Sequence, residues 1–166
     1  PQISAENASV EGIESDRAYA SGETVEFTVS PSRGYRVVKV TLNGEEIVAG
    51  ESGYSYTVQD SDTAIVIVVQ TELISLETAV TVTPEGSAEV SGYELSYGID
   101  DAVTFTVTAN AGYEITRVTV NGYDVTASDN VYSYIVKDTD SAVEIVVETA
   151  KKQLTVSKTV TNATLG

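Results

Sequence analysis

The chain repeats itself. Shifting the sequence by 78 positions places residues 22–71 on residues 100–149 without a gap, and 22 of these 50 positions are identical. Many of the differences are conservative, as where Lys39 aligns with Arg117. A fixed internal period indicates a series of structural modules. The sequence therefore predicts two domains, residues 1–76 and 77–150. We interpret residues 151–166 as a linker followed by the first strand of a further, truncated domain.

The composition excludes several kinds of chemistry. The chain contains no cysteine, histidine, methionine or tryptophan. Disulfides, His- or Cys-based metal sites, and catalysis by a His base or a Cys nucleophile are therefore impossible. Two carboxylates across a cleft could hydrolyse a glycoside, but modules of about 75 residues offer no obvious cleft. We expect no enzymatic activity and no cofactor.

The formal net charge of −16 is the second compositional constraint. A polyanion is repelled by phosphate backbones and by anionic lipid, so we expect no nucleic-acid partner. No apolar run reaches the ~18 residues of a membrane span, so no membrane insertion is expected. The chain opens on Pro1 without a signal peptide, and we interpret it as a piece of a longer protein.

Short alternating stretches predict strands in both copies. Val, Thr, Ile and Tyr are frequent and favour strands, and apolar residues recur every second position around Phe27 and Phe105. The alternation slips by one position near Val38-Lys39 and Thr116-Arg117, which predicts a β-bulge. The inward positions predict a core made of Phe27, Tyr35, Val40, Leu42, Phe105, Tyr113, Val118 and Val120.

Each copy also carries a hairpin signal. Asn43-Gly44 and Asn121-Gly122 lie between apolar runs, and a type I′ turn requires positive φ at both central residues, which Asn and Gly tolerate. Five to seven short strands per copy without a convincing helix predict an all-β protein of two tandem small β-sandwich (Ig-like) modules. A β-grasp-like module with a short helix is the alternative.

An Asp-x-Asp pair recurs at the same place in both copies, as Asp60/Asp62 and Asp138/Asp140. Calcium binds six to eight oxygens, of which such a pair can supply two. Asp also builds tight turns by accepting bonds from its own backbone. Because no third acid follows at a fixed spacing, we favour turns and keep these four residues as the only metal candidates.

Paired tyrosines recur as well. Tyr54 and Tyr56 match Tyr132 and Tyr134, and two-residue spacing places each pair on one face of a strand. Aromatic faces can stack on sugar rings, but a carbohydrate platform usually includes tryptophan, which this chain lacks. We favour a packing role over sugar binding.

The repeated motif resembles a known family. Residues 103–122 read VTFTVTANAGYEITRVTVNG, and YSYIV follows at 132–136. This pattern is similar to divergent InlB B-repeat modules, which occur in series in surface proteins of Gram-positive bacteria. The resemblance covers residues 22–71 and 100–149. It implies a stalk or an adhesin-like architecture, extracellular exposure on the bacterial cell surface and no catalysis, and it brings no set of ligand residues.

The tail has a second resemblance. Residues 154–161 are similar to the first strand of Gram-positive pilin domains, in which an early lysine joins an asparagine through an isopeptide bond. Lys158 stands at the matching position, but the rest of such a domain does not follow.

Two functions are consistent with this sequence. The first is a structural stalk that presents a distal domain and contacts only neighbouring domains of the same chain. The second is an adhesin module that binds a host surface protein or a glycan through an exposed face. Positions expected on the surface differ between the copies, as where Tyr123 replaces Glu45. A shared binding face would repeat such residues, so we favour the stalk.

Overall fold

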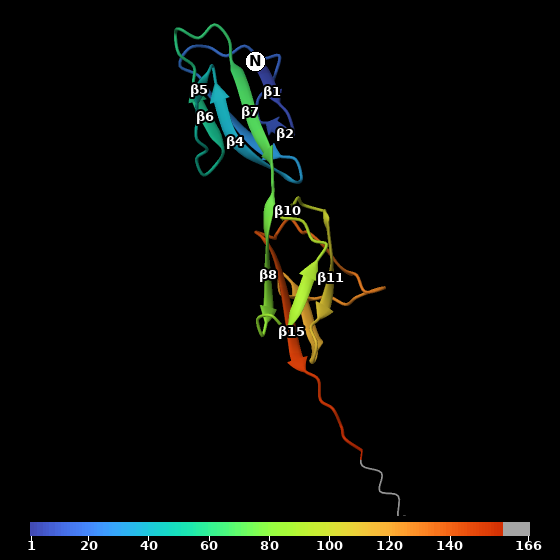
Figure 1. Ribbon diagram of the computed structural model, residues 1–166. Coiled ribbons are helices and arrows are strands. Elements are labelled where there is room, and N and C mark those ends of the chain that lie inside the picture. The colour runs from blue at the N-terminus through green and yellow to red at the C-terminus, as the bar shows by residue number, and fades with distance from the viewer. Residues whose placement is uncertain (158–166) are drawn as a thin grey trace, which may run out of the picture. The chain divides into compact units, whose positions relative to one another are not determined.

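A computed structural model describes residues 1–157 of the chain. These residues form fifteen strands and no helix, arranged as tandem β-sandwiches without a barrel (Figure 1). The predicted fold class is therefore confirmed. The described residues contain no helix of the kind that the β-grasp alternative needs.

Strands β1 to β7 form copy 1. They are β1 (Gln2–Ala5), β2 (Ala8–Glu11), β3 (Thr24–Pro31), β4 (Tyr35–Leu42), β5 (Glu45–Glu46), β6 (Tyr54–Thr57) and β7 (Val66–Leu73). One sheet has the order β1-β7-β4-β5 and the other the order β2-β3-β6. Between them lies a core of Val25, Phe27, Val40, Leu42, Val58, Ile65, Ile67 and Val69.

Strands β8 to β15 form copy 2. They are β8 (Leu76–Thr83), β9 (Ala88–Ser91), β10 (Ser96–Tyr97), β11 (Ala102–Ala109), β12 (Tyr113–Val120), β13 (Tyr123–Asp124), β14 (Tyr132–Ile135) and β15 (Val143–Lys151). One sheet contains the order β8-β15-β12-β13 and the other has β14-β11-β9. Their facing sides bury Val103, Phe105, Val107, Val118, Val120, Val136, Val143, Ile145 and Val147.

By the contacts among its residues, the chain divides into two compact units. Unit 1 comprises Pro1–Leu76 together with Ser96–Asp101 and Ile135–Asp140. Unit 2 comprises Glu77–Leu95, Ala102–Tyr134 and the described residues from Ser141 onward. Most of copy 1 therefore lies in unit 1 and most of copy 2 in unit 2.

The second strand of each repeated motif carries the predicted bulge. The register of β4 against β7 shifts between Val37 and Lys39, and that of β12 against β15 shifts between Ile115 and Arg117. A bulge inserts one unpaired residue, which explains why the apolar phase changes within the strand. The bulge prediction is confirmed in both copies.

The Asn-Gly pairs adopt left-handed backbone. Asn43 and Gly44 have φ of 50° and 86°, and Asn121 and Gly122 have φ of 49° and 79°. Positive φ at two successive residues matches the right-handed twist of the strands on either side of a hairpin. These turns connect β4 to β5 and β12 to β13.

Candidate functional site

The first and last strands of each copy pair in parallel. In copy 1, β1 pairs with β7 from Gln2↔Val66 to Ala5↔Val69. In copy 2, β8 pairs with β15 from Thr78↔Val143 to Thr83↔Glu148. Neither pairing can be read from the alternation of side chains, because a period of two gives the face of a strand and not its neighbour.

Parallel pairing places the entry and the exit of each copy at opposite ends. Gln2 is level with Val66, and the last strand then continues to Leu73, a rise of about 23 Å at 3.3 Å per residue. Thr78 is level with Val143, and β15 continues to Lys151, a rise of about 26 Å. An antiparallel pair would return the chain to the end where it entered.

A threonine ties the far end of this parallel pair in both copies. The Thr71 hydroxyl donates to the Glu6 carbonyl at 2.9 Å. At the aligned position, Thr149 Oγ1 lies 2.6 Å from Ser87 Oγ and 3.5 Å from the Thr83 carbonyl oxygen. Ser87 is only 1% exposed. Each last strand is thus bonded to the segment that directly follows the first strand.

The turn asparagines do more than supply positive φ. Asn43 Oδ1 accepts the Val66 N–H at 2.8 Å, and Asn121 Oδ1 accepts the Glu144 N–H at 2.7 Å. Asn43 Nδ2 donates to Asp62, and Asn121 Nδ2 donates to the Ala142 carbonyl, both at 2.9 Å. Each hairpin is thereby attached to the start of the last strand. The sequence indicated this side-chain role, because both copies keep Asn at a position where Gly would also permit positive φ.

The residues predicted to form the core differ in burial. Phe27, Val40, Leu42, Phe105, Val118 and Val120 are buried. Tyr35 and Tyr113 are only partly buried at the start of β4 and β12. Both follow a glycine with positive φ at the turn that precedes these strands.

The four metal candidates have partners within the protein. Asp62 and Asp140 each accept the backbone N–H of the residue three positions earlier at 2.8 Å, which closes the turn. Asp60 accepts a bond from the Ser21 hydroxyl. Within residues 1–157, no group of three or more acidic side chains is placed to hold a metal ion.

Asp62 accepts hydrogen bonds from three donors. In addition to Gln59 N–H, it accepts bonds from Tyr56 Oη at 2.8 Å and from Asn43 Nδ2. The backbone bond from Gln59, followed by the Tyr56 hydroxyl, lowers the pKa of Asp62. The hydrogen bond that Tyr56 donates to Asp62, together with burial, raises the pKa of Tyr56. This network joins the β6 strand, the Asp-x-Asp turn and the Asn-Gly turn of copy 1.

Two of the repeated tyrosines stack on the core phenylalanines. The rings of Phe27 and Tyr54 lie 5.3 Å apart at 14°, and those of Phe105 and Tyr132 lie 5.4 Å apart at 14°. Tyr134 is 8% exposed, and its ring lies 6.1 Å from that of Tyr123. These contacts give the paired tyrosines a packing role in each sandwich.

Unit 1 also contains an arginine that binds two carboxylates. Arg33 donates to Asp100 through Nε at 2.7 Å and Nη2 at 2.8 Å, and to Asp138 at 3.0 Å. The bidentate bond lowers the pKa of Asp100. The Arg33 side chain is 57% exposed, and the Asp100 side chain is 55% exposed. Sequence comparison of the copies did not find this group, because Arg33 aligns with Ala111.

An open cavity of about 470 Å³ lies in unit 1 and is lined by residues that include Pro1, Arg17, Tyr19 and Asp62. The Arg17 guanidinium pairs with Glu23 and lies 4.7 Å over the Tyr19 ring. The Arg17 and Asp62 side chains that line this cavity therefore already have partners within the protein.

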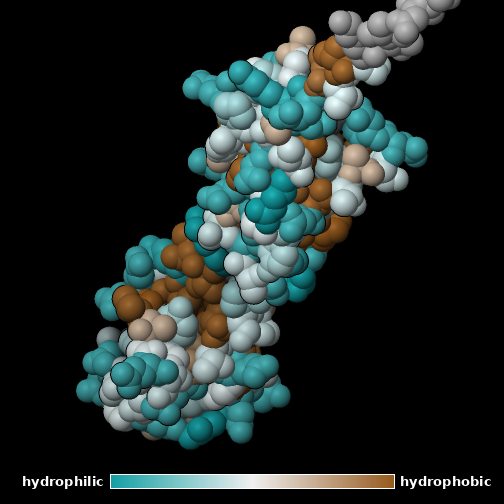
Figure 2. All heavy atoms as spheres, turned by 90° about the horizontal axis from the view of Figure 1, so that it is seen from below, coloured by the Kyte–Doolittle hydropathy of each residue, from teal (hydrophilic) through white to brown (hydrophobic). Residues whose placement is uncertain are grey.

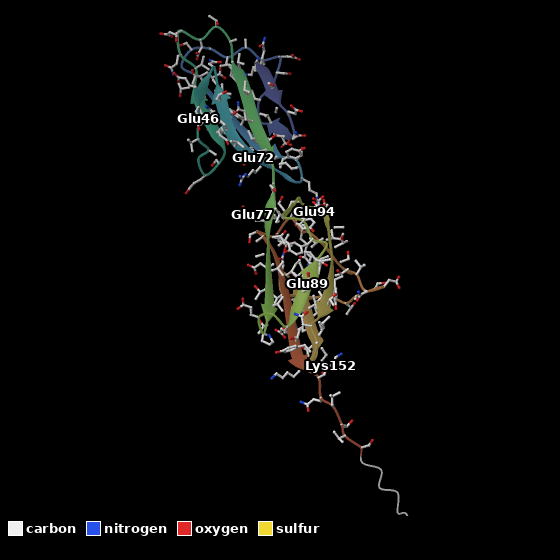
Figure 3. All side chains as sticks on the ribbon, in the orientation of Figure 1. Glu46, Glu72, Glu77, Glu89, Glu94 and Lys152 are labelled. Atoms are coloured by element: carbon white, nitrogen blue, oxygen red, sulfur yellow. The ribbon has the colours of Figure 1, made fainter. Side chains whose placement is uncertain are left out.

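The surface is largely hydrophilic on the face drawn in Figure 2, with hydrophobic residues gathered in separate patches. Acidic side chains such as Glu46, Glu77 and Glu89 are exposed along the strands (Figure 3). Leu154 and Val156 are 87% and 92% exposed beyond the end of β15. Lys158 lies outside the described residues. Among the described residues, no helix has the length and apolar character needed to cross a membrane.

Comparison with known proteins identifies the repeat. A family model described as the divergent InlB B-repeat domain matches residues 2–68 and again residues 78–162. No curated protein and no solved structure matches the chain. The two matches cover most of the sequence and coincide with the two sandwiches. The chain therefore belongs to the divergent InlB B-repeat domain family, whose modules occur as repeats in bacterial surface proteins.

Proposed function

We propose that this chain is a stalk segment of an extracellular protein on the surface of a Gram-positive bacterium, and that it holds a distal domain away from the cell wall. One observation carries the proposal. In both copies the parallel first and last strands place the entry and exit of the chain at opposite ends of the module. Each copy therefore adds the length of its strands to the span of the chain.

Other features support a spacing role. The aligned residues keep the core and the turns, whereas exposed positions differ, as with Glu45 and Tyr123. The repeated tyrosines pack against their own sandwich. A module selected to bind one ligand would repeat an exposed group instead. Binding of a host protein or a glycan remains the alternative prediction.

The test displays a reporter epitope at the end of the chain on a bacterial cell. The reporter is joined to a wall anchor through both copies, through copy 2 alone, or through two chains in series. Antibody binding should rise with the number of copies, because each adds about 23–26 Å. Equal antibody binding for all three proteins would contradict the stalk. Saturable binding of the isolated chain on a glycan array would favour the adhesin.

A further inference from the structure

We propose that the parallel pair of first and last strands is a mechanical clamp that keeps each copy folded under tension, and that the clamp of copy 2 is the stronger. This inference rests on the proposed stalk role, since only a chain held at both ends bears tension. The clamp itself is a property of each sandwich. It can be measured on the isolated chain.

The direction of pull decides how the hydrogen bonds are loaded. Tension draws the start of the first strand and the end of the last strand in opposite directions. Because the two strands are parallel neighbours, this force slides one along the other and loads all the ladder bonds together. In an antiparallel pair pulled apart from its open end, the bonds would break one after another. Simultaneous loading raises the barrier to forced unfolding, which is governed by the unfolding rate.

The first strand is the part that should slide. The last strand lies between the first strand and an antiparallel neighbour in both copies. β7 pairs with β4 over seven residues, from Tyr35↔Leu73 to Leu42↔Ile67, but with β1 over only four. Separating β1 from β7 therefore breaks fewer bonds than separating β4 from β7. The parallel pair is the interface that sets the resistance.

The two clamps differ in length and in their threonine tie. The parallel pair has four residues on each strand in copy 1 and six in copy 2. In copy 2 the tie between Thr149 and Ser87 lies at a buried serine, where water competes less for the hydrogen bond. In copy 1 the tie runs from Thr71 to the Glu6 carbonyl and is exposed. More bonds loaded together predict a higher unfolding force for copy 2.

The first experiment pulls the whole chain by its two ends in a single-molecule force instrument. An insertion of about 20 Gly/Ser residues between Asp129 and Asn130, in an exposed loop of copy 2, identifies that copy by lengthening its unfolding step by about 7 nm. We expect the shorter step first and the lengthened step at a higher force. The lengthened step at the lower force, or equal forces for the two steps, would overturn the ranking of the clamps.

Three variants of copy 2 then test the clamp. The Thr78 N–H donates to the Leu95 carbonyl and therefore points away from β15. Because successive N–H groups of a strand point to opposite sides, the N–H of Thr81, three residues later, points toward β15 and donates to that strand. Thr81→Pro removes that donor, and the higher force should fall to about half or less. Thr149→Val removes the tie, keeps the shape of the side chain and should give a smaller loss of force.

Thr116→Val is the matched control for Thr149→Val. The Thr116 hydroxyl donates to the Glu148 carbonyl at 3.0 Å, across the pair of β12 and β15 that should not slide. We expect its unfolding force to match the parent chain. Equal losses of force for Thr149→Val and Thr116→Val would overturn the clamp even if Thr81→Pro fails to fold. If the unfolding forces support the clamp but antibody binding on the cell does not rise with the number of copies, the stalk is contradicted and the clamp is not.

Discussion

The two copies agree in their interiors and differ at their terminal strands. The stacked pair of Phe and Tyr has the same geometry in both, with ring centroids 5.3 Å and 5.4 Å apart and the same 14° between ring planes. The parallel pair of first and last strands instead grows from four residues to six. Duplication has thus kept the packing that defines the module, while the length of the terminal pairing has changed.

This difference separates two properties of a repeat. Close packing makes the interior intolerant of a change in volume, so both copies keep Val, Phe and Tyr at the same positions. A ladder between two neighbouring strands depends on backbone bonds, which almost any side chain permits. Ser4 and Thr81 lie at equivalent places in the two first strands, both are exposed, and they differ between the copies. The stability of the core and the length of the terminal pairing can therefore change independently from copy to copy.

The largest effect is expected in the shared core. Phe27 and Phe105 are 3% and 1% exposed and stack on equivalent tyrosines. Replacing either with Ala should lower the free energy of unfolding of its own copy by about 3–5 kcal/mol, because a large cavity remains. Urea unfolding gives the loss, and hydrogen exchange followed by mass spectrometry locates it.

The conservative variants Phe27→Leu and Phe105→Leu serve as controls and should lose much less stability. If the two Ala variants lose amounts of unfolding free energy that differ by more than about 2 kcal/mol, the two interiors are not equivalent. Loss of exchange protection in both copies from a single variant would show that the two sandwiches unfold together.

The turn asparagines should give the second largest effect. Asn43→Ala and Asn121→Ala strain a residue at positive φ and remove the bond to an N–H in the first two residues of the last strand. We expect each to cost about 2 kcal/mol, since αL strain adds to the loss of a partly buried hydrogen bond. Thermal unfolding measures the loss.

Asn→Gly at the same positions separates the two causes. Glycine accepts positive φ without strain, so only the loss of the side-chain bonds remains. Asn43→Gly and Asn121→Gly should therefore cost about half as much as the Ala variants. If the Gly and Ala variants lose the same stability, backbone strain contributes nothing, and the asparagine acts only through its hydrogen bonds.

The sequence predicted features that depend on neighbours along the chain. The bulge near Val38 and Thr116 followed from a change of phase, and the β-sandwich followed from short alternating strands with turn signals. Both depend on which side of a strand faces the interior. Internal repetition strengthened each inference, because the same pattern occurred twice.

The parallel terminal pair could not be predicted in this way. Which strands become neighbours depends on how the whole module closes, and the alternation at Val80 and Val82 would be the same beside any partner. The tie between Thr149 and Ser87 joins residues 62 positions apart, so no local spacing reveals it. The group around Arg33 was missed for another reason, since comparing the copies finds only features that both retain.

A third and smaller effect concerns pH. Since hydrogen bonds lower the pKa of Asp62 in the folded state, its ionised form stabilises copy 1 above the pKa of about 3.9 that Asp has in an unfolded chain. This contribution is lost as the pH falls through the lower folded pKa. Asp62→Asn should therefore lower stability at pH 7 and weaken its decline below about pH 4.

Tyr56→Phe removes one of the donors to Asp62 and should weaken the same acid dependence in part. Urea unfolding between pH 7 and pH 2.5 measures both variants. A decline in stability below pH 4 that is as steep in Asp62→Asn as in the parent chain would assign the acid sensitivity of copy 1 to other carboxylates.

The smallest effect is expected at an ion pair that both copies keep with different residues. Lys39 lies 3.3 Å from Glu46, and at the aligned positions Arg117 lies 2.6 Å from Asp124. Both pairs cross the short hairpin and are exposed, so each should contribute little to stability, and less in high salt. Arg117 binds Asp124 through two nitrogens, which favours the copy 2 pair.

A double-mutant cycle in each copy, built from Lys39→Ala with Glu46→Ala and from Arg117→Ala with Asp124→Ala, measures the two coupling energies. We expect the coupling to be larger in copy 2, and we expect 1 M salt to reduce both. The charge signs are the same in both copies while the residue type differs at both positions, which is the pattern of an interaction that needs opposite charge and little geometry. A larger coupling for Lys39 with Glu46 would contradict the advantage assigned to the arginine, and the two hairpins would then differ in a way that their hydrogen bonds do not explain.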